Sequence, residues 1–206
     1  MITEQYSFNP EVSEDDYLTL PAARSIFLNW GYAVALAILS AIGLLASLLL
    51  AIDGWRALQQ GSDAQLLCSI DPALDCAPAM QLWQAQILGF PNSYLGIFAF
   101  ATALAVSMAF LAGATTRWFR IGLLIGTILG QLLIFFLMYT TFTLLPALCP
   151  WCTVIWIVTW PLLWLQIVSF RPRLNYLRWP ILVGGYVIAT IIGLLTMGLR
   201  ILWPTI

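Results

Sequence analysis

Residues 149–170 read CPWCTVIWIVTWPLLWLQIVSF, and this stretch decides the fold class. It is an apolar run without a charged residue, and a helix of that length spans a hydrocarbon core of about 30 Å at about 1.5 Å per residue. Its first four residues form a C-x-x-C motif at the predicted N-terminal edge of the helix. The stretch therefore predicts a membrane-spanning helix that begins with a pair of thiols.

Comparable apolar runs recur along the chain. Of its 206 residues, 62% are hydrophobic and 8% are charged, whereas a soluble domain carries about 25% charged residues. We therefore expect an all-α membrane protein with one domain over residues 24–206, after a polar N-terminal tail over residues 1–23. The expected transmembrane helices cover residues 26–52, 94–112, 121–142, 149–170 and 181–203. The acidic N-terminus does not resemble a cleavable signal peptide.

The arginines predict the orientation of this bundle, because short cytoplasmic loops retain basic residues. Only two arginines, Arg56 and Arg200, fall on the side opposite the others, which are Arg24, Arg117, Arg120, Arg171, Arg173 and Arg178. We therefore expect a cytoplasmic N-terminus and an extracytoplasmic C-terminus. The long connection over residues 53–91 then lies outside the membrane with all the cysteines, and residues 78–90 are expected to form a short helix that caps the bundle.

Several classes of function are excluded by composition. The chain has no histidine and a net charge of -1, so it lacks both a basic surface for nucleic acid and imidazole for catalysis or metal ligation. Gly122, Gly126 and Gly130, spaced four residues apart, are expected to let another helix approach closely. The remaining candidates for chemistry are the cysteines.

The four cysteines are arranged as two pairs. Cys149 and Cys152 begin a helix, where unpaired amides and the helix dipole favour a thiolate, and Cys152 lies one turn deeper than Cys149. Cys68 and Cys76 lie in the outer loop. Two pairs of this kind can exchange a disulfide and deliver two electrons to a lipid-soluble acceptor, which suggests a quinone. A structural loop disulfide and a zinc site, which the spacing of Cys68 and Cys76 fits poorly, remain as alternatives.

These motifs, in this order, resemble the vitamin K epoxide reductase family. The resemblance covers about residues 30–170 and includes Cys68-x7-Cys76, the sequence GFPNSYLG over residues 89–96, and the C-x-x-C motif. In the related DsbB-type oxidases the C-x-x-C pair comes first rather than last. The resemblance implies a four-helix catalytic bundle plus a fifth helix, without the fused thioredoxin domain that some relatives carry.

The resemblance also implies a role for each site residue. Cys68 would meet the redox partner, Cys76 would exchange with Cys149, and Cys152 would lie next to the quinone. The quinone-binding residues would be Asn92, Trp156, Met80 and Leu82. Asn92 has helix N-capping, together with Ser93, as its alternative role. Ser69 and Leu82 depart from the family pattern, which commonly has aspartate and serine at these places.

The expected function is that of a bacterial disulfide-forming quinone reductase in the inner membrane. It would re-oxidise a thioredoxin-like, DsbA-like partner supplied in trans and reduce menaquinone or ubiquinone. One alternative is a vitamin K epoxide or quinone reductase whose useful product is the reduced quinone. An alternative of another class is a non-enzymatic membrane scaffold held by structural disulfides.

Overall fold

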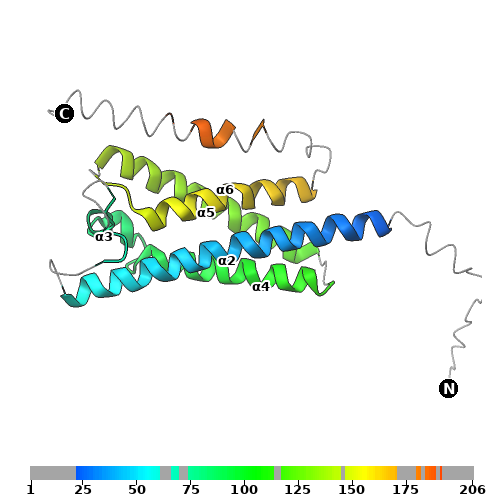
Figure 1. Cartoon of the computed structure of the whole chain (residues 1–206), viewed down its shortest axis with the longest axis horizontal. Helices are drawn as coiled ribbons and strands as arrows, with labels where there is room; N and C mark the ends of the chain where they lie inside the picture. Colours follow the sequence, from blue (N-terminus) through cyan, green and yellow to red (C-terminus); the bar gives the residue numbers. More distant parts are fainter. Residues whose placement is uncertain are drawn as a thin grey trace, which may run out of the picture.

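The computed structural model describes residues 22–60, 66–69, 74–113, 117–144, 147–170, 180–181, 184–188 and 191. They form an all-helical structure whose long helices are α2 (Ala22–Gln60), α4 (Asn92–Leu111), α5 (Arg117–Leu144) and α6 (Pro150–Phe170). Figure 1 shows an antiparallel bundle in which each long helix runs opposite to the one before it. Residues 1–21 of the expected tail and most of the expected fifth helix, residues 181–203, lie outside the described residues.

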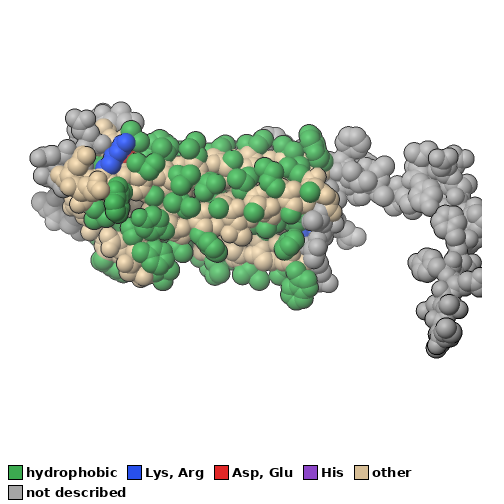
Figure 2. All heavy atoms as spheres, turned by 90° about the horizontal axis from the view of Figure 1, so that it is seen from below, with side chains coloured by type: hydrophobic (Ala, Val, Ile, Leu, Met, Phe, Trp, Pro, Cys, Tyr) green, Lys and Arg blue, Asp and Glu red, His purple; other side chains and the backbone are tan. Residues whose placement is uncertain are grey.

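The bundle has the length and surface of a membrane domain. Within the described residues, the spans long and apolar enough to cross a bilayer are Trp30–Gln60, Asn92–Leu111, Trp118–Leu144 and Pro150–Phe170. Hydrophobic side chains cover the flank of the bundle seen in Figure 2, and arginines are visible only near its ends. The expected all-α membrane architecture is therefore confirmed for four helices, and the protein is an integral membrane protein.

Helix α2 is longer than the sequence predicts. The expected outer loop was to begin at residue 53, but residues 53–60 continue the helix to Gln60. The expectation was wrong because an aspartate after an apolar run is typical of the start of a loop. Here the carboxylate of Asp53 instead accepts hydrogen bonds from Leu67 and Trp151. At about 1.5 Å per residue, α2 is roughly 60 Å long and extends well past a hydrocarbon core of about 30 Å.

The expected capping helix over residues 78–90 is not continuous. The structure has instead a short helix α3 (Ala77–Met80) and a 3-10 turn η2 (Trp83–Gln86). Leu82 takes an extended backbone conformation, with φ -73° and ψ 142°, and so separates the two. Gln84 of η2 is buried, whereas Trp83 and Leu88 are exposed. The segment lies at one end of the bundle (Figure 1).

Close helix packing occurs at glycines other than the expected ones. A Cβ on Gly43 of α2 would collide with the Phe100 ring of α4, and one on Gly96 would lie 2.6 Å from Ser47 Oγ. Among the described residues nothing lies within 4 Å of a Cβ built on the predicted stripe of Gly122, Gly126 and Gly130. The close approach predicted at that stripe therefore has no partner among the described residues, because four-residue spacing gives a smooth face but does not specify what packs on it.

Helices α2 and α6 are joined at both ends by hydrogen bonds. At one end, Tyr32 Oη donates to Oε1 of the fully buried Gln166 over 2.7 Å. At the other end, Trp151 Nε1 donates to Asp53 Oδ2 over 3.1 Å. Side-chain hydrogen bonds between helices are the specific contacts that a bilayer leaves available, since lipid tails are as apolar as leucine. These two bonds fix how α6 lies along α2, and so where its first residues stand.

We expect Gly43→Ala to destabilise the bundle by about 1–3 kcal/mol, because the added methyl group must displace a buried phenyl ring. Gly126→Ala is the matched control, since it makes the same change on a helix face where nothing in the described structure lies within 4 Å. Reversible unfolding in detergent micelles measures the difference. Equal stabilities for the two variants would contradict the packing described for α2 and α4.

Candidate functional site

The four cysteines lie together at one end of the bundle. Cys68, Cys76 and Cys149 share a buried cluster with Leu66, and Cys152 packs against it. Cys68 and Cys76 form a disulfide, with their Cα atoms 5.8 Å apart. Cys149 and Cys152 are free thiols. The structure therefore holds the loop pair oxidised and the membrane pair reduced.

The two pairs meet through one sulfur from each. Cys76 Sγ lies 3.0 Å from Cys149 Sγ, although the residues are separated by 73 positions in the chain. This separation is the distance at which a nucleophile and its target are ready to react. The arrangement can therefore carry thiol-disulfide exchange between the loop pair and the membrane pair without movement of a helix.

Cys149 occupies the N-cap of α6. Its carbonyl oxygen accepts the N–H of Thr153 over 3.1 Å, and its sulfur accepts the N–H of Cys152 over 3.3 Å. The sulfur thus takes the place of a serine or aspartate oxygen in an ordinary helix cap. Pro150 follows at the first helical position, where the absent N–H costs nothing. The sequence builds a thiol into the position that best stabilises a negative charge.

The pKa of Cys149 is lowered from its ordinary value. The largest cause is a hydrogen bond from the Cys152 thiol, and the backbone N–H groups of Cys152 and Trp151 add to it. Burial and the negative charge of Asp53 oppose the shift. A lowered pKa makes the thiolate both more populated near neutral pH and a better leaving group in disulfide exchange.

The loop disulfide is buried rather than displayed. Cys68 and Cys76 are both 0% exposed, although the sequence places them in a long connection outside the membrane. Ser69 Oγ and the N–H of Ala77 both donate to Asp75 Oδ1, so one carboxylate ties together the segments that carry the two cysteines. A reaction partner must displace the side chains that cover Cys68 before it can reach the sulfur.

Asn92 lies at the start of α4 but does not cap it. Pro91 is the N-cap residue, and no side chain makes a capping hydrogen bond there, so the capping alternative is wrong. Asn92 Nδ2 donates to the carbonyl oxygen of Gln84 over 2.7 Å. Because a carbonyl oxygen only accepts, this bond fixes the orientation of the amide.

Two buried acceptors remain near this bond. Within the described residues, Asn92 Oδ1 and Gln84 Oε1 have no hydrogen-bond partner. Unsatisfied buried oxygens are uncommon and costly in folded proteins. Two acceptors suit a ligand that donates hydroxyl groups, such as a hydroquinone, whereas the carbonyl oxygens of an oxidised quinone only accept.

The other three expected quinone contacts lie in different surroundings. Met80 packs against the cysteine cluster together with Cys152. Leu82 is half-buried at the break between α3 and η2, and the Trp156 ring lies 6.2 Å from the ring of Phe142. Among the described contacts, Met80 is thus the member of this set that the structure brings to the cysteines.

Asp53 and Gln84 are polar residues at this end that the sequence reasoning missed. Asp53 is fully buried and accepts hydrogen bonds from Leu67 N at 3.0 Å and from Trp151 Nε1. Asp53 could have been found as an acidic residue directly after an apolar run, because a carboxylate at a membrane boundary usually has a hydrogen-bonding or charged partner. Gln84 gave no such signal, because an amide in a polar loop is ordinary.

A comparison with known proteins supports this site. The sequence model described as "Vitamin K epoxide reductase family" matches residues 34–167, which include all four cysteines, Asn92 and Asp53. The chain belongs to the vitamin K epoxide reductase family. Its members are quinone-dependent oxidoreductases, so this chain is an enzyme of that kind. No curated protein sequence matches the chain closely.

Family membership bears on the alternative uses of the cysteines. Vitamin K epoxide reductase enzymes use a quinone and a thiol redox partner, and the Cys149 and Cys152 thiols next to a disulfide are suited to that chemistry. In the part of the chain that the structure describes, no group of three or more histidine, cysteine or acidic residues is placed to hold a metal ion. The 3.0 Å contact between Cys76 Sγ and Cys149 Sγ has the geometry that disulfide exchange requires.

We expect Cys152→Ala to raise the pKa of Cys149 toward the ordinary thiol value of about 8.5, because it removes the strongest donor to the sulfur. Cys152→Ser retains a hydroxyl donor and should raise the pKa less. The measurement is the ultraviolet absorbance of the thiolate as a function of pH, with Cys149→Ser as the spectroscopic blank. An unchanged titration midpoint in Cys152→Ala would show that this donor does not stabilise the thiolate.

Proposed function

We propose that this enzyme re-oxidises a thioredoxin-like, DsbA-like partner and passes two electrons to menaquinone or ubiquinone, so that disulfides form in the extracytoplasmic space of a bacterium. The observation that carries the proposal is the 3.0 Å separation of Cys76 Sγ and Cys149 Sγ. It joins a loop disulfide, which a protein partner can reduce, to a pair of thiols on a membrane helix.

The proposed sequence begins when a thiolate of the partner attacks Cys68. The Cys68–Cys76 bond breaks, and the partner's second thiol then releases Cys68, which leaves the partner oxidised and the loop pair reduced. Cys76 next attacks Cys149 of an oxidised membrane pair and expels Cys152 as a thiolate, which takes up a proton. Cys68 finally attacks Cys76 and expels Cys149. Two electrons have then moved from the partner to the membrane pair.

The described state corresponds to the end of that sequence. The loop disulfide has closed again, Cys149 and Cys152 are both reduced, and Cys149 still lies beside Cys76. The lowered pKa of Cys149 assists the last step, because a thiol of lower pKa leaves faster. The pair Cys149 and Cys152 then has two electrons and two protons to give.

A bound quinone supplies an acceptor for two electrons and two protons. We assign its head group to Asn92, whose second Nδ2 hydrogen can donate and whose Oδ1 can accept. Met80, Leu82 and Trp156 are proposed as apolar contacts. Cys152 is proposed as the thiol next to the quinone, because it lies one helical turn deeper than Cys149.

The proposed orientation sets the cysteines outside the cytoplasmic membrane and the N-terminus inside. Arg56 lies on the helix that carries Asp53, at the cysteine end. Arg120 lies on α5 and donates to the Ser169 carbonyl near the end of α6, at the opposite end of the bundle. The excess of arginines expected at that opposite end supports this orientation. We further propose a fifth span over residues 181–203, which sets the C-terminus outside.

Two other functions remain to be separated from this one. A vitamin K epoxide or quinone reductase would use the same cysteines but would make the reduced ligand its useful product. Purified enzyme with a reduced thioredoxin-like protein should therefore reduce a plain quinone and leave a quinone epoxide unchanged. Rapid turnover of the epoxide would favour the alternative. A non-enzymatic scaffold would show no quinone-dependent oxidation of a dithiol.

We expect Cys152→Ser to abolish quinone-dependent oxidation of a dithiol in proteoliposomes, because Cys149 loses its disulfide partner. Mapping of disulfides after thiol blocking should recover a Cys76–Cys149 bond in part of the population. Ser107→Ala, which changes a buried group in α4 far from the cysteines in sequence, is the control for folding. Retained activity in Cys152→Ser would exclude the relay, and a Cys149 that never pairs with Cys76 would exclude its order.

We expect Asn92→Ala to raise the KM for quinone by about tenfold, because one hydrogen bond to a buried polar group is lost. Reduction of the loop disulfide by the partner should be unaffected. Ser93→Ala is the neighbouring control, since Ser93 is also buried at the start of α4. Steady-state rates at varied quinone concentration provide the test, and an unchanged KM in Asn92→Ala would remove Asn92 from the proposed quinone site.

A further inference from the structure

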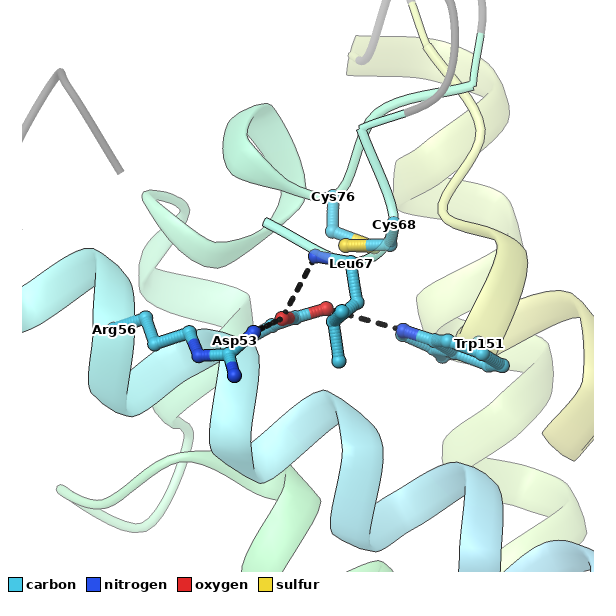
Figure 3. A network of polar contacts seen from close by, with 6 residues as sticks. All are labelled: Asp53, Arg56, Leu67, Cys68, Cys76 and Trp151. Atoms are coloured by element: carbon cyan, nitrogen blue, oxygen red, sulfur yellow. Dashed lines mark hydrogen bonds and ion pairs between the residues drawn. A yellow bond between two sulfur atoms is a disulfide. The ribbon is translucent and has the colours of Figure 1, made fainter. Parts of the chain in front are cut away.

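Asp53 is a fully buried carboxylate at the cysteine end of α2. A charge in such a position is costly unless donors surround it. Here Oδ1 accepts the backbone N–H of Leu67 over 3.0 Å, and Oδ2 accepts the indole N–H of Trp151 over 3.1 Å. Figure 3 shows Leu67 approaching the carboxylate from above and Trp151 approaching it from the right.

Arg56 is the weaker partner of this carboxylate. Its Nη1 lies 3.8 Å from Asp53 Oδ1, and its side chain is 40% exposed. An ion pair that is long and open to solvent contributes little to stability. The two N–H donors therefore account for most of the compensation of the buried charge.

The two donors belong to the two cysteine pairs. Leu67 directly precedes Cys68, and Trp151 stands between Cys149 and Cys152 in the C-x-x-C motif. One carboxylate on a long, regular helix is thus hydrogen-bonded to the backbone of the loop pair and to a side chain of the membrane pair. Cys76 is connected to the same point through its disulfide with Cys68.

We propose that Asp53 is the positioning residue of the relay: its carboxylate holds the Leu67–Cys68 segment and the first turn of α6 so that Cys76 and Cys149 stay within exchange distance. This inference rests on the proposed function and specifies how its internal step is aligned. Asp53 has no described hydrogen bond to a sulfur, so it acts through Leu67 and Trp151.

The charge of Asp53 gives the proposal a second observable. That charge opposes the thiolate of Cys149 and raises its pKa against the larger lowering effects. Asp53→Asn removes the charge, so the pKa of Cys149 should fall and its thiolate should become more populated. If Asp53 aligns the sulfurs, exchange should nevertheless become slower. A purely structural residue would not change the pKa and the rate in these opposite directions.

The experiment measures the internal step without quinone or partner. In a Cys68→Ser/Cys152→Ser background the remaining thiols are Cys76 and Cys149. Diamide, a two-electron oxidant, removes two electrons and two protons from them as their disulfide forms. We expect Asp53→Asn to slow formation of this bond by about tenfold, since loss of alignment by a fraction of an ångström has effects of that order.

Two further variants make the test specific. Arg56→Gln removes the long ion pair and should leave the rate within about twofold of the background. Trp151→Phe removes one donor and should slow bond formation by itself. It should add little in an Asp53→Ala background, which lacks both acceptor oxygens, because both changes then break the same hydrogen bond and double-mutant cycles detect that shared contact.

The proposal would be overturned if folded Asp53→Asn formed the Cys76–Cys149 bond as fast as the Cys68→Ser/Cys152→Ser protein does. If Asp53→Asn does not fold, Trp151→Phe decides in its place, and a background rate there would overturn the proposal as well. The proposed function is tested separately, through quinone-dependent oxidation in the four-cysteine protein. If quinone-dependent oxidation is absent but bond formation depends on Asp53, the proposed function fails and the positioning role stands. If quinone-dependent oxidation is present but bond formation does not depend on Asp53, only the positioning role fails.

Discussion

The hydrogen bond from the Cys152 N–H to the Cys149 sulfur connects the fold of this protein to its chemistry. A helix that enters a bilayer must satisfy its first amides at the membrane boundary, because no water follows it inward. Here the acceptor is a thiol instead of a hydroxyl or a carboxylate. The Cys149 sulfur therefore both caps α6 and carries the stabilised thiolate. The start of α6 and the position of this sulfur are fixed together.

Much of the architecture could be predicted from the sequence, because a bilayer permits few solutions. Apolar runs of sufficient length gave four of the helices to within a few residues at most ends, and the C-x-x-C motif correctly marked the start of α6. The end of α2 was missed by eight residues. Taken alone, Asp53 is typical of the start of a loop. Its side chain is instead held by Leu67 and Trp151, which lie 14 and 98 positions further along the chain.

The site was less accessible to sequence reasoning than the helices. The cysteines were identified by type and order, but the burial of Cys68 depends on how a loop folds back onto the bundle, which no local pattern encodes. The sequence predicted that Asn92 either binds a ligand or caps α4, and the structure excludes the capping role. Its contact with Gln84 could not be anticipated, because η2 results from an extended Leu82 in a segment that favoured a continuous helix.

The burial of the loop disulfide has a consequence for selectivity. Small thiols reach exposed disulfides by collision alone, but a bond with both sulfurs at 0% exposure is sheltered from such encounters. A protein partner that reshapes the segment around Cys68 while it docks would therefore reach this bond more readily than a freely diffusing small thiol. Burial of this disulfide would in this way slow the loss of oxidising equivalents to low-molecular-weight reductants.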